Sequence, residues 1–315
     1  MTVARLILGY YHPWPNDAGF YAARTHGHTA AAGIDLRIGV VDPGRGDTLA
    51  HLARGEGDLG VVPTNRLLAA RARGQKVVAV ATINQTGLES IHSLGSLGIT
   101  RPRDLAGRRV ALNPTPRGLA MVRHLVAADG GDPDAIVVVD SGSRELQSQD
   151  LLDGFADAYF GAYWAWDELF DPYTGEDRLS WPVKDHGAPA FPSYVLVARE
   201  EWAEANADAL RGLLRAAEQG FRQAATAPDA PAEFDKVAPY FSREAIRRSF
   251  ALISPTWFAG DRWGVIHDDV VASYAHWLAD NGAIPDLSGL PGATTTAYLG
   301  AAGQLADELV AQGVS

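Results

Sequence analysis

The feature that most constrains the fold is a regular alternation of short apolar runs and helical stretches in the first half of the chain. One pair occupies roughly 25–30 residues, the size of a strand–helix–strand unit. This alternation predicts an α/β fold with a largely parallel sheet. The expected strands are Arg5–Gly9, Asp35–Val40, Leu59–Val62 and Val77–Thr82, and the expected helices are Asp17–His26, Asp47–Arg54 and Pro63–Arg73.

A second alternating set follows the Pro- and Gly-punctuated stretch Gly98–Gly107, and the turn-rich segment Gly187–Pro192 ends it. Crossovers near residues 90–98 and 187–192 predict two lobes, with residues 1–92 and 193–315 in lobe 1, residues 93–192 in lobe 2 and a ligand cleft between them. The chain after the last strand is expected to be helical and to pack on lobe 1. The elements expected here are strands Arg109–Leu112, Ile136–Val139, Ala158–Phe160 and Tyr194–Ala198, and helices Arg117–Ala128, Arg144–Leu152, Glu200–Thr226, Ala232–Tyr240, Arg243–Ile253, Asp268–Asn281 and Ala301–Ala311.

The composition excludes several classes of function. A net charge of −11 over 315 residues argues against a nucleic-acid partner, which needs a basic footprint. The absence of cysteine removes thiol nucleophiles, iron–sulfur clusters and thiolate zinc sites. Only Lys76, Lys184 and Lys236 could anchor a Schiff base, and no ligand spacing suggests a metal. We therefore expect neither a metal nor a cofactor.

The location of the protein is predicted from its first residues and its hydropathy. No apolar run approaches the roughly 18 residues of a membrane span. The segment Met1–Gly9 lacks the regions of a signal peptide, which predicts a cytoplasmic protein as the sequence stands, or an extracytoplasmic one if an export signal was removed.

Common catalytic motifs are absent or misplaced. The glycines of Gly55–Gly60 follow a helix and precede a strand, the reverse of a dinucleotide-binding turn, so we interpret them as a connection. Gly95–Gly98 lacks the glycine spacing of a nucleophile elbow. His26 and His28 have no third ligand nearby and are interpreted as surface residues.

The candidate binding residues follow strand ends, because ligands of open parallel sheets bind at the carboxyl ends of the strands. His12 either lines the cleft or packs beside it, and Thr115 either caps a helix or binds a polar group together with Arg117. The candidates chosen on position are His12, Trp14, Asn16, Asp17, Asn65, Asn84, Asn113, Thr115, Arg117 and Ser141.

The segment Tyr163-Trp164-Ala165-Trp166-Asp167-Glu168 is the most unusual feature of the sequence. Its rings at a strand end offer flat surfaces and polar edges to a planar ligand. The alternative is that the rings fill the core between the lobes.

The chain resembles the type 2 periplasmic solute-binding fold, and within it the family shared by thiamine-pyrimidine-precursor binding proteins of ABC importers and the fungal synthase of that pyrimidine. The resemblance implies an aminopyrimidine-like ligand in contact with Asn16, Tyr163, Trp164, Asp167, Phe191 and Ser193. The fungal branch has a histidine and a lysine where this chain has Val61–Arg66, so its suicide chemistry is not expected. The segments that carry the resemblance are Pro15–Ala23, Leu52–Gly60, Leu67–Gly74, Asp104–Val110, Tyr163–Asp167, Gly187–Pro189, Trp277–Leu278 and Gly282–Ile284.

Two hypotheses of different class follow. The first is a solute-binding protein, expected to be a monomer, whose lobes close on a small heteroaromatic compound and whose partners are an ABC permease and ATPase. The second is a cytoplasmic enzyme on the same fold that acts on an aromatic or heteroaromatic substrate; its catalytic residues are unknown. Analogy with the fold favours binding.

Overall fold

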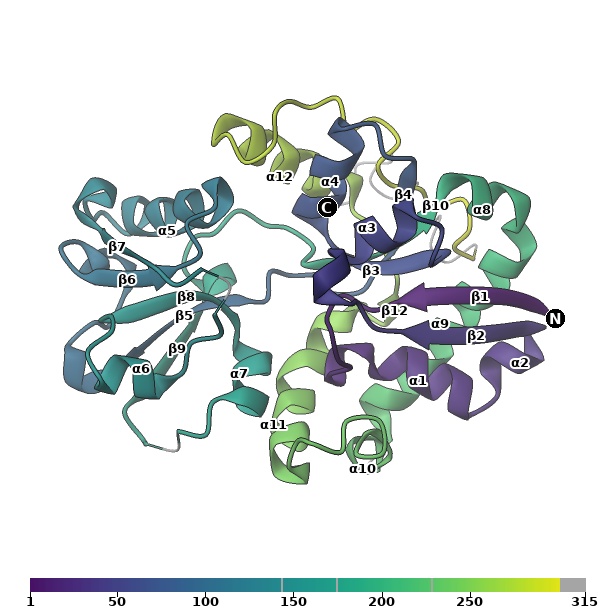
Figure 1. The fold of residues 1–315 in the computed structure, drawn as a ribbon, viewed down its shortest axis with the longest axis horizontal. Coiled ribbons are helices and arrows are strands. Elements are labelled where there is room, and N and C mark those ends of the chain that lie inside the picture. The colour runs from purple at the N-terminus through teal and green to yellow at the C-terminus, as the bar shows by residue number, and fades with distance from the viewer. Residues whose placement is uncertain (143, 174, 228, 301–315) are drawn as a thin grey trace. The chain divides into compact units, whose positions relative to one another are not determined.

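The computed structural model describes residues 1–300 apart from 143, 174 and 228, with the side chains of residues 162, 164 and 231 also outside the description. The expected helix Ala301–Ala311 lies outside the described residues. The chain forms two compact units, each with a five-stranded sheet and helices packed on it (Figure 1). Residues 1–85, 191–275 and 286–300 form the first unit, and residues 86–190 and 276–285 form the second.

The sheet of the first unit has the order β2-β1-β3-β10-β4. It is parallel except for β10, which runs antiparallel to both β3 and β4. The largely parallel sheet predicted from the alternation is confirmed, and each expected strand lies within a few residues of its predicted bounds. The strands are β1 (Thr2–Ile7), β2 (Ile34–Gly39), β3 (Leu59–Pro63), β4 (Val77–Thr82) and β10 (Tyr194–Arg199).

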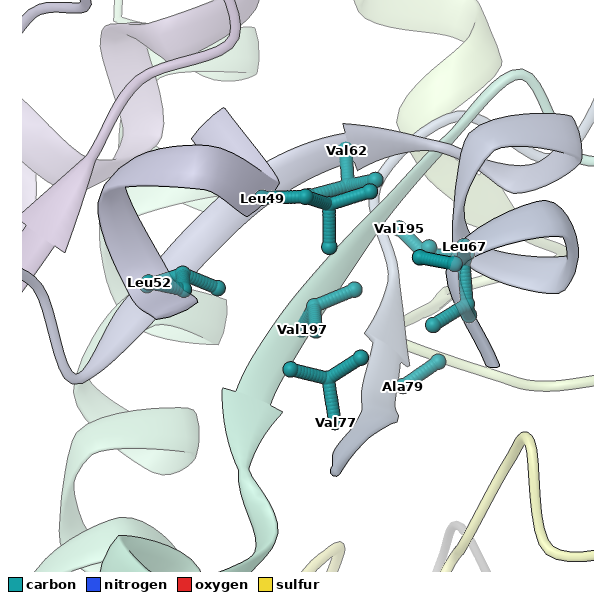
Figure 2. Close-up of a cluster of buried hydrophobic side chains, with 9 residues drawn as sticks. Leu49, Leu52, Val62, Leu67, Val77, Ala79, Val195 and Val197 are labelled. Atoms are coloured by element: carbon teal, nitrogen blue, oxygen red, sulfur yellow. The ribbon is translucent and has the colours of Figure 1, made fainter. Parts of the chain in front are cut away.

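One face of this sheet is covered by α3 and α4. Leu49 and Leu52 of α3 and Leu67 of α4 pack on alternate residues of three strands, such as Val195 and Val197 (Figure 2). This packing buries the apolar residues that the strand pattern singled out. The helices that begin in the first unit are α1 (Ala18–Thr25), α2 (His28–Ala31), α3 (Thr48–Ala53), α4 (Thr64–Ala72), α8 (Glu200–Ala205), α9 (Ala207–Thr226), α10 (Ala230–Phe234), α11 (Arg243–Ile253) and α12 (Asp268–Asp280).

Helices α1 and α9 approach each other through glycines. A Cβ built on Gly220 would lie 2.1 Å from the carbonyl oxygen of Gly19, so only glycine permits this contact. The long helix expected at Glu200–Thr226 is divided at Asn206, whose φ and ψ of −126° and 34° are not helical. The prediction of one continuous helix was therefore wrong at that residue.

The sheet of the second unit has the order β7-β6-β8-β5-β9. Here β5 is the antiparallel strand, paired with β8 and β9, and it belongs to the second unit. The strands are β5 (Glu89–Leu94), β6 (Arg109–Leu112), β7 (Val137–Asp140), β8 (Ala158–Tyr163) and β9 (Arg178–Pro182), and the helices are α5 (Pro116–Ala128), α6 (Ser148–Leu152) and α7 (Trp164–Phe170).

Several expectations differ from the structure. Strands β5 and β9 were not predicted, and helix α6 begins at Ser148 rather than at Arg144. The stretch expected to be helical after β10 contains the hairpin β11 (Phe258–Ala259) and β12 (Arg262–Trp263), closed at Gly260, whose φ of 62° suits glycine. Within the described part of the chain, no helix is both long and apolar enough to cross a membrane.

Candidate functional site

The topology gathers the predicted residues at one edge of each sheet. In the first unit, the amino end of antiparallel β10 lies at the carboxyl ends of β3 and β4, with Tyr194 opposite Pro63 and Val195 opposite Thr82. In the second unit, Glu89 at the amino end of β5 lies opposite Tyr163 at the end of β8. Each unit therefore carries its own group of candidate residues at such an edge.

A buried amide network joins the first unit's loops. The Oδ1 atom of Asn16 accepts hydrogen bonds from Asn84 Nδ2 at 2.8 Å and from Trp257 Nε1 at 3.0 Å. Asn16 Nδ2 donates in turn to Asn84 Oδ1 at 3.1 Å, and Asn84 Nδ2 also donates to Thr256 Oγ1 at 2.8 Å. Asn16 and Asn84 are buried. Because buried amides need partners, this network fixes the loops that follow β1 and β4.

Phe191 and Ser193 adjoin this network. The backbone N–H of Ser193 donates to the carbonyl of Asn84 at 3.1 Å, and the carbonyl of Ser193 accepts from the N–H of Thr64 at 3.2 Å. Phe191 is buried and stacks on Tyr274 with ring centroids 4.6 Å apart. Asn65 lies partly exposed in the first turn of α4. The structure thus brings Asn16, Asn84 and Ser193 together.

An aromatic cluster lies beside the end of β1. It consists of Tyr10, Tyr11 and His12, which follow β1, and of Tyr240 and Phe241, which follow α10. The His12 centroid lies 4.8–5.4 Å from the centroids of the four other rings. Burial lowers the pKa of His12, which favours its neutral form. Tyr11 is 45% exposed and Tyr240 is 57% exposed. The cluster therefore presents aromatic surface to solvent at the expected edge.

Asp17 is a buried acid close to this cluster. Its Oδ2 atom accepts a hydrogen bond from the N–H of Trp14, itself buried, at 3.1 Å. Burial raises the pKa of Asp17 to about 7, because the charged form loses its hydration. The pKa of Tyr240 is raised by burial and then by Asp17, so the two groups interact.

The second unit's edge carries exposed polar residues from the loop before α5. Asn113 and Thr115 are exposed. Thr115 Oγ1 accepts a hydrogen bond from the N–H of Gly118 at 3.1 Å, as the capping interpretation predicts. Ser141, after β7, is partly buried and donates its N–H to the carbonyl of Leu112 at 3.1 Å.

Arg117 forms an ion pair with Glu89, a residue that sequence reasoning did not select. Arg117 Nη2 lies 2.7 Å from Glu89 Oε2, and Nη1 contacts Oε1. The guanidinium therefore holds both carboxylate oxygens in the two-point geometry typical of arginine.

Asp167 is the centre of a buried polar cluster. It accepts a hydrogen bond from the Tyr159 hydroxyl at 3.0 Å, and its Oδ2 lies 2.9 Å from His92 Nδ1 and 3.8 Å from Arg178 Nη2. The Ser90 hydroxyl contacts His92 Nε2. This Ser–His–Asp order resembles a catalytic triad, but Ser90 and His92 are 0% and 1% exposed, so no substrate reaches the hydroxyl.

The aromatic segment is only partly described. Tyr163 ends β8 and is partly exposed, whereas Trp166 is buried and stacks on Phe170 with centroids 6.1 Å apart. Trp164 opens α7, and its side chain lies outside the described residues.

A cavity of about 150 Å³ lies away from these residues, between α1, α9 and α10. Its lining includes Tyr21, Phe234 and Val237, and no residue selected from the sequence lines it. In the part of the chain that the structure describes, no three histidine, aspartate or glutamate side chains are grouped as a metal site requires.

Comparison with known proteins places this arrangement in a family. Residues 14–231 match the family model described as NMT1/THI5 like. The chain is 27% identical over 229 residues to the formylaminopyrimidine-binding protein of Halalkalibacterium halodurans, an alignment that covers 73% of this chain and 68% of that protein.

Solved structures share the fold. The periplasmic aliphatic sulphonate-binding protein SsuA of Escherichia coli matches with a TM-score of 0.73 and 16% identity over 92% of this chain and 96% of that one. The desulfurization enzyme DSZB matches with a TM-score of 0.62 and 16% identity over 98% of this chain and 99% of that one. The predicted bilobed solute-binding fold class is confirmed, and the fold alone accommodates both a binding protein and an enzyme.

Proposed function

The chain belongs to the NMT1/THI5-like family, and on this premise we propose that it binds a small planar heteroaromatic solute of the thiamine-pyrimidine-precursor type as the binding protein of an ABC importer. The relative named as a formylaminopyrimidine-binding protein supports this ligand class. In this role the protein works outside the cytoplasm and delivers its solute to an ABC permease that is driven by an ATPase.

The observation that carries the proposal is the aromatic cluster of the first unit. Tyr11 and Tyr240 expose about half of their surface beside the end of β1, where tyrosine, a residue of intermediate burial, offers a ring to solvent. A planar ring that stacks on them removes apolar surface from water, and the aromatic contact itself contributes about 0.5–1.5 kcal/mol. The buried network of Asn16 and Asn84 holds the adjoining loops, so little ordering is required on binding.

The test is a thermal-shift screen of pyrimidines, with and without amino groups, against the full chain. A ligand at 100 times its Kd contributes about 2.7 kcal/mol, which raises Tm by roughly 4 °C in a protein of this size. Calorimetry with the best stabiliser should show a Kd about 2- to 12-fold weaker for Tyr240→Ala. Tyr173→Ala, which alters a tyrosine of the second unit, should leave Kd unchanged. The absence of any stabiliser, or equal losses in the two variants, would contradict the proposal.

One observation favours a second candidate, an enzyme that acts on an aromatic or heteroaromatic substrate. Burial lowers the pKa of His12, so its partly exposed ring is neutral near pH 7 and can take a proton from a substrate held by the aromatic cluster. Mass spectrometry of each bound compound after incubation distinguishes the candidates. A product formed by the natural chain but not by His12→Asn supports catalysis, whereas recovery of unchanged ligand supports binding.

A further inference from the structure

The cavity of about 150 Å³ between α1, α9 and α10 lies wholly within the first unit (Figure 1). Four alanines line it: Ala18 and Ala22 share one face of α1, Ala224 belongs to α9, and Ala230 begins α10. Because an alanine side chain ends at Cβ, helices that meet through alanines leave space that larger side chains would fill. No residue assigned to the proposed ligand site lines this cavity.

Two aromatic rings form part of the cavity wall. Tyr21 of α1 and Phe234 of α10 meet edge to face, with ring centroids 6.1 Å apart and an interplanar angle of 80°. Phe234 is buried, and Val237 adds another apolar side chain to the lining. An engineered cavity of about 150 Å³ with apolar walls binds benzene in another protein. The space therefore fits one six-membered ring.

The lining also carries hydrogen-bond donors. Within the part of the chain that the structure describes, the side-chain donors of Tyr21, Thr25 and Lys236 have no hydrogen-bond partner, and Lys236 has no ion-pair partner. Burial raises the pKa of Tyr21, so its hydroxyl keeps its proton and remains a donor.

The open side of the cavity carries a positive charge. Thr25 and Lys236 are exposed, so their donors lie where the cavity meets solvent. Glu233 of the lining is held by His26, whose Nε2 lies 2.9 Å from Glu233 Oε2. The carboxylate is therefore engaged, whereas the ammonium group and the hydroxyl are available to a ligand.

We propose that this cavity is a second ligand site, separate from that of the proposed function, and that it takes a small monocyclic carboxylate of the size of benzoate. The ring lies against Tyr21 and Phe234, and the carboxylate meets Lys236 at the open side. A carboxylate suits this place because it accepts charge-assisted hydrogen bonds from an ammonium group and a further bond from a hydroxyl. A ring that carries an amine would instead bring a like charge towards Lys236.

Calorimetry on the full chain with three probes that share one ring tests the proposal: benzoate, benzyl alcohol and benzylamine. The natural chain should bind benzoate most tightly. Lys236→Gln should weaken benzoate about 3- to 10-fold and leave benzyl alcohol within about twofold, since the partner of the carboxylate is exposed. The matched control is Lys76→Gln, which removes an exposed lysine of the same unit that does not line the cavity and should leave benzoate unchanged.

A second variant locates the bound ring. Ala224→Leu adds three carbon atoms from α9 to the space that the ring would occupy. It should weaken benzoate and benzyl alcohol more than about 10-fold, while Tm does not fall, because the new side chain fills a void.

Three results would overturn the inference: no binding of benzoate to the natural chain, equal losses in the two lysine variants, or full benzoate affinity in a folded Ala224→Leu protein. Should Ala224→Leu fail to fold, the lysine variants decide alone, because Lys236 is exposed and its replacement leaves the core intact. The result is independent of the proposed function: a chain that binds pyrimidines but not benzoate keeps that function and lacks the second site.

Discussion

Replacing Asp17 by asparagine should stabilise the protein at neutral and alkaline pH. The carboxyl group is 1% exposed, and burial raises its pKa from 3.8 to about 7. Asparagine has nearly the same shape, and its side-chain oxygen can still accept the hydrogen bond that the N–H of Trp14 donates at 3.1 Å. The substitution therefore removes the cost of burying a charge while keeping the local contact.

The sign of the effect follows from the two protonation states. Between pH 3.8 and about 7 the unfolded carboxyl ionises while the folded one keeps its proton, so the free energy of unfolding falls as pH rises. Above about pH 7 both states are ionised and the full penalty applies; at 1.36 kcal/mol per pKa unit it amounts to about 4 kcal/mol. Relative to the natural chain, Asp17→Asn should gain about 3 kcal/mol more at pH 8 than at pH 5.

Urea unfolding of both proteins, measured at intervals from pH 5 to pH 8, gives this difference directly. Carboxylates with lowered pKa values, such as Glu56 beside Arg54, add their own pH dependence, and this cancels when the variant is subtracted from the natural chain. Asp47→Asn is the matched control, because Asp47 also lies at a helix start but its side chain is 40% exposed, so its replacement removes no buried charge. A difference for Asp17→Asn that does not grow with pH would refute the reasoning.

Two further predictions concern folding. Asn84→Ala removes the partner of the buried Asn16 Nδ2 atom and should lower the free energy of unfolding by at least about 1–3 kcal/mol; an unchanged urea midpoint would show that the network adds nothing. Gly220→Ala places a methyl group 2.1 Å from the carbonyl oxygen of Gly19 and should cost at least about 1–3 kcal/mol in thermal unfolding. Gly212→Ala on the same helix meets its nearest atom at 3.4 Å and should be neutral or slightly stabilising, so similar losses in both variants would contradict the packing argument.

The sequence predicted the strands whose buried residues are mostly apolar. All six residues of β4 are apolar or small and buried, so its pattern identifies it. All six residues of β5 are also buried, but they read Glu-Ser-Ile-His-Ser-Leu and carry no strand signal. They are tolerated inside because partners from distant segments satisfy them: the Ser93 hydroxyl donates to the carbonyl of Asp157 at 2.9 Å, and Arg117 pairs with Glu89. Tertiary pairing of this kind is not visible in a local pattern.

Local sequence patterns also identified only some residues of the candidate site. The strand-end rule selected Asn16 and Asn84, which are 68 residues apart and do form hydrogen bonds with each other. It did not select Trp257, which lies 241 residues from Asn16 and contacts it, nor Tyr240 of the aromatic cluster. Both lie in a stretch that the sequence analysis treated as helical packing, where an aromatic residue is expected in the core.

The sequence prediction missed strand β5 and the carboxylate of Glu89 for the same reason, because Glu89 is the first residue of that strand. Arg117 was selected for its positive charge at a strand-to-helix loop, where an anion would be expected. The structure supplies that negative charge from within the unit, because β5 inserts beside β8 and brings Glu89 to the same edge. Because the polar sequence of β5 does not read as a strand, it gave no indication that Glu89 pairs with Arg117. With Glu89 in place, this edge of the sheet carries an ion pair of no net charge instead of an isolated cation. An expectation about ligand charge therefore depends on the sheet order, because only the placement of β5 beside β8 shows that Glu89 already pairs with the charge of Arg117.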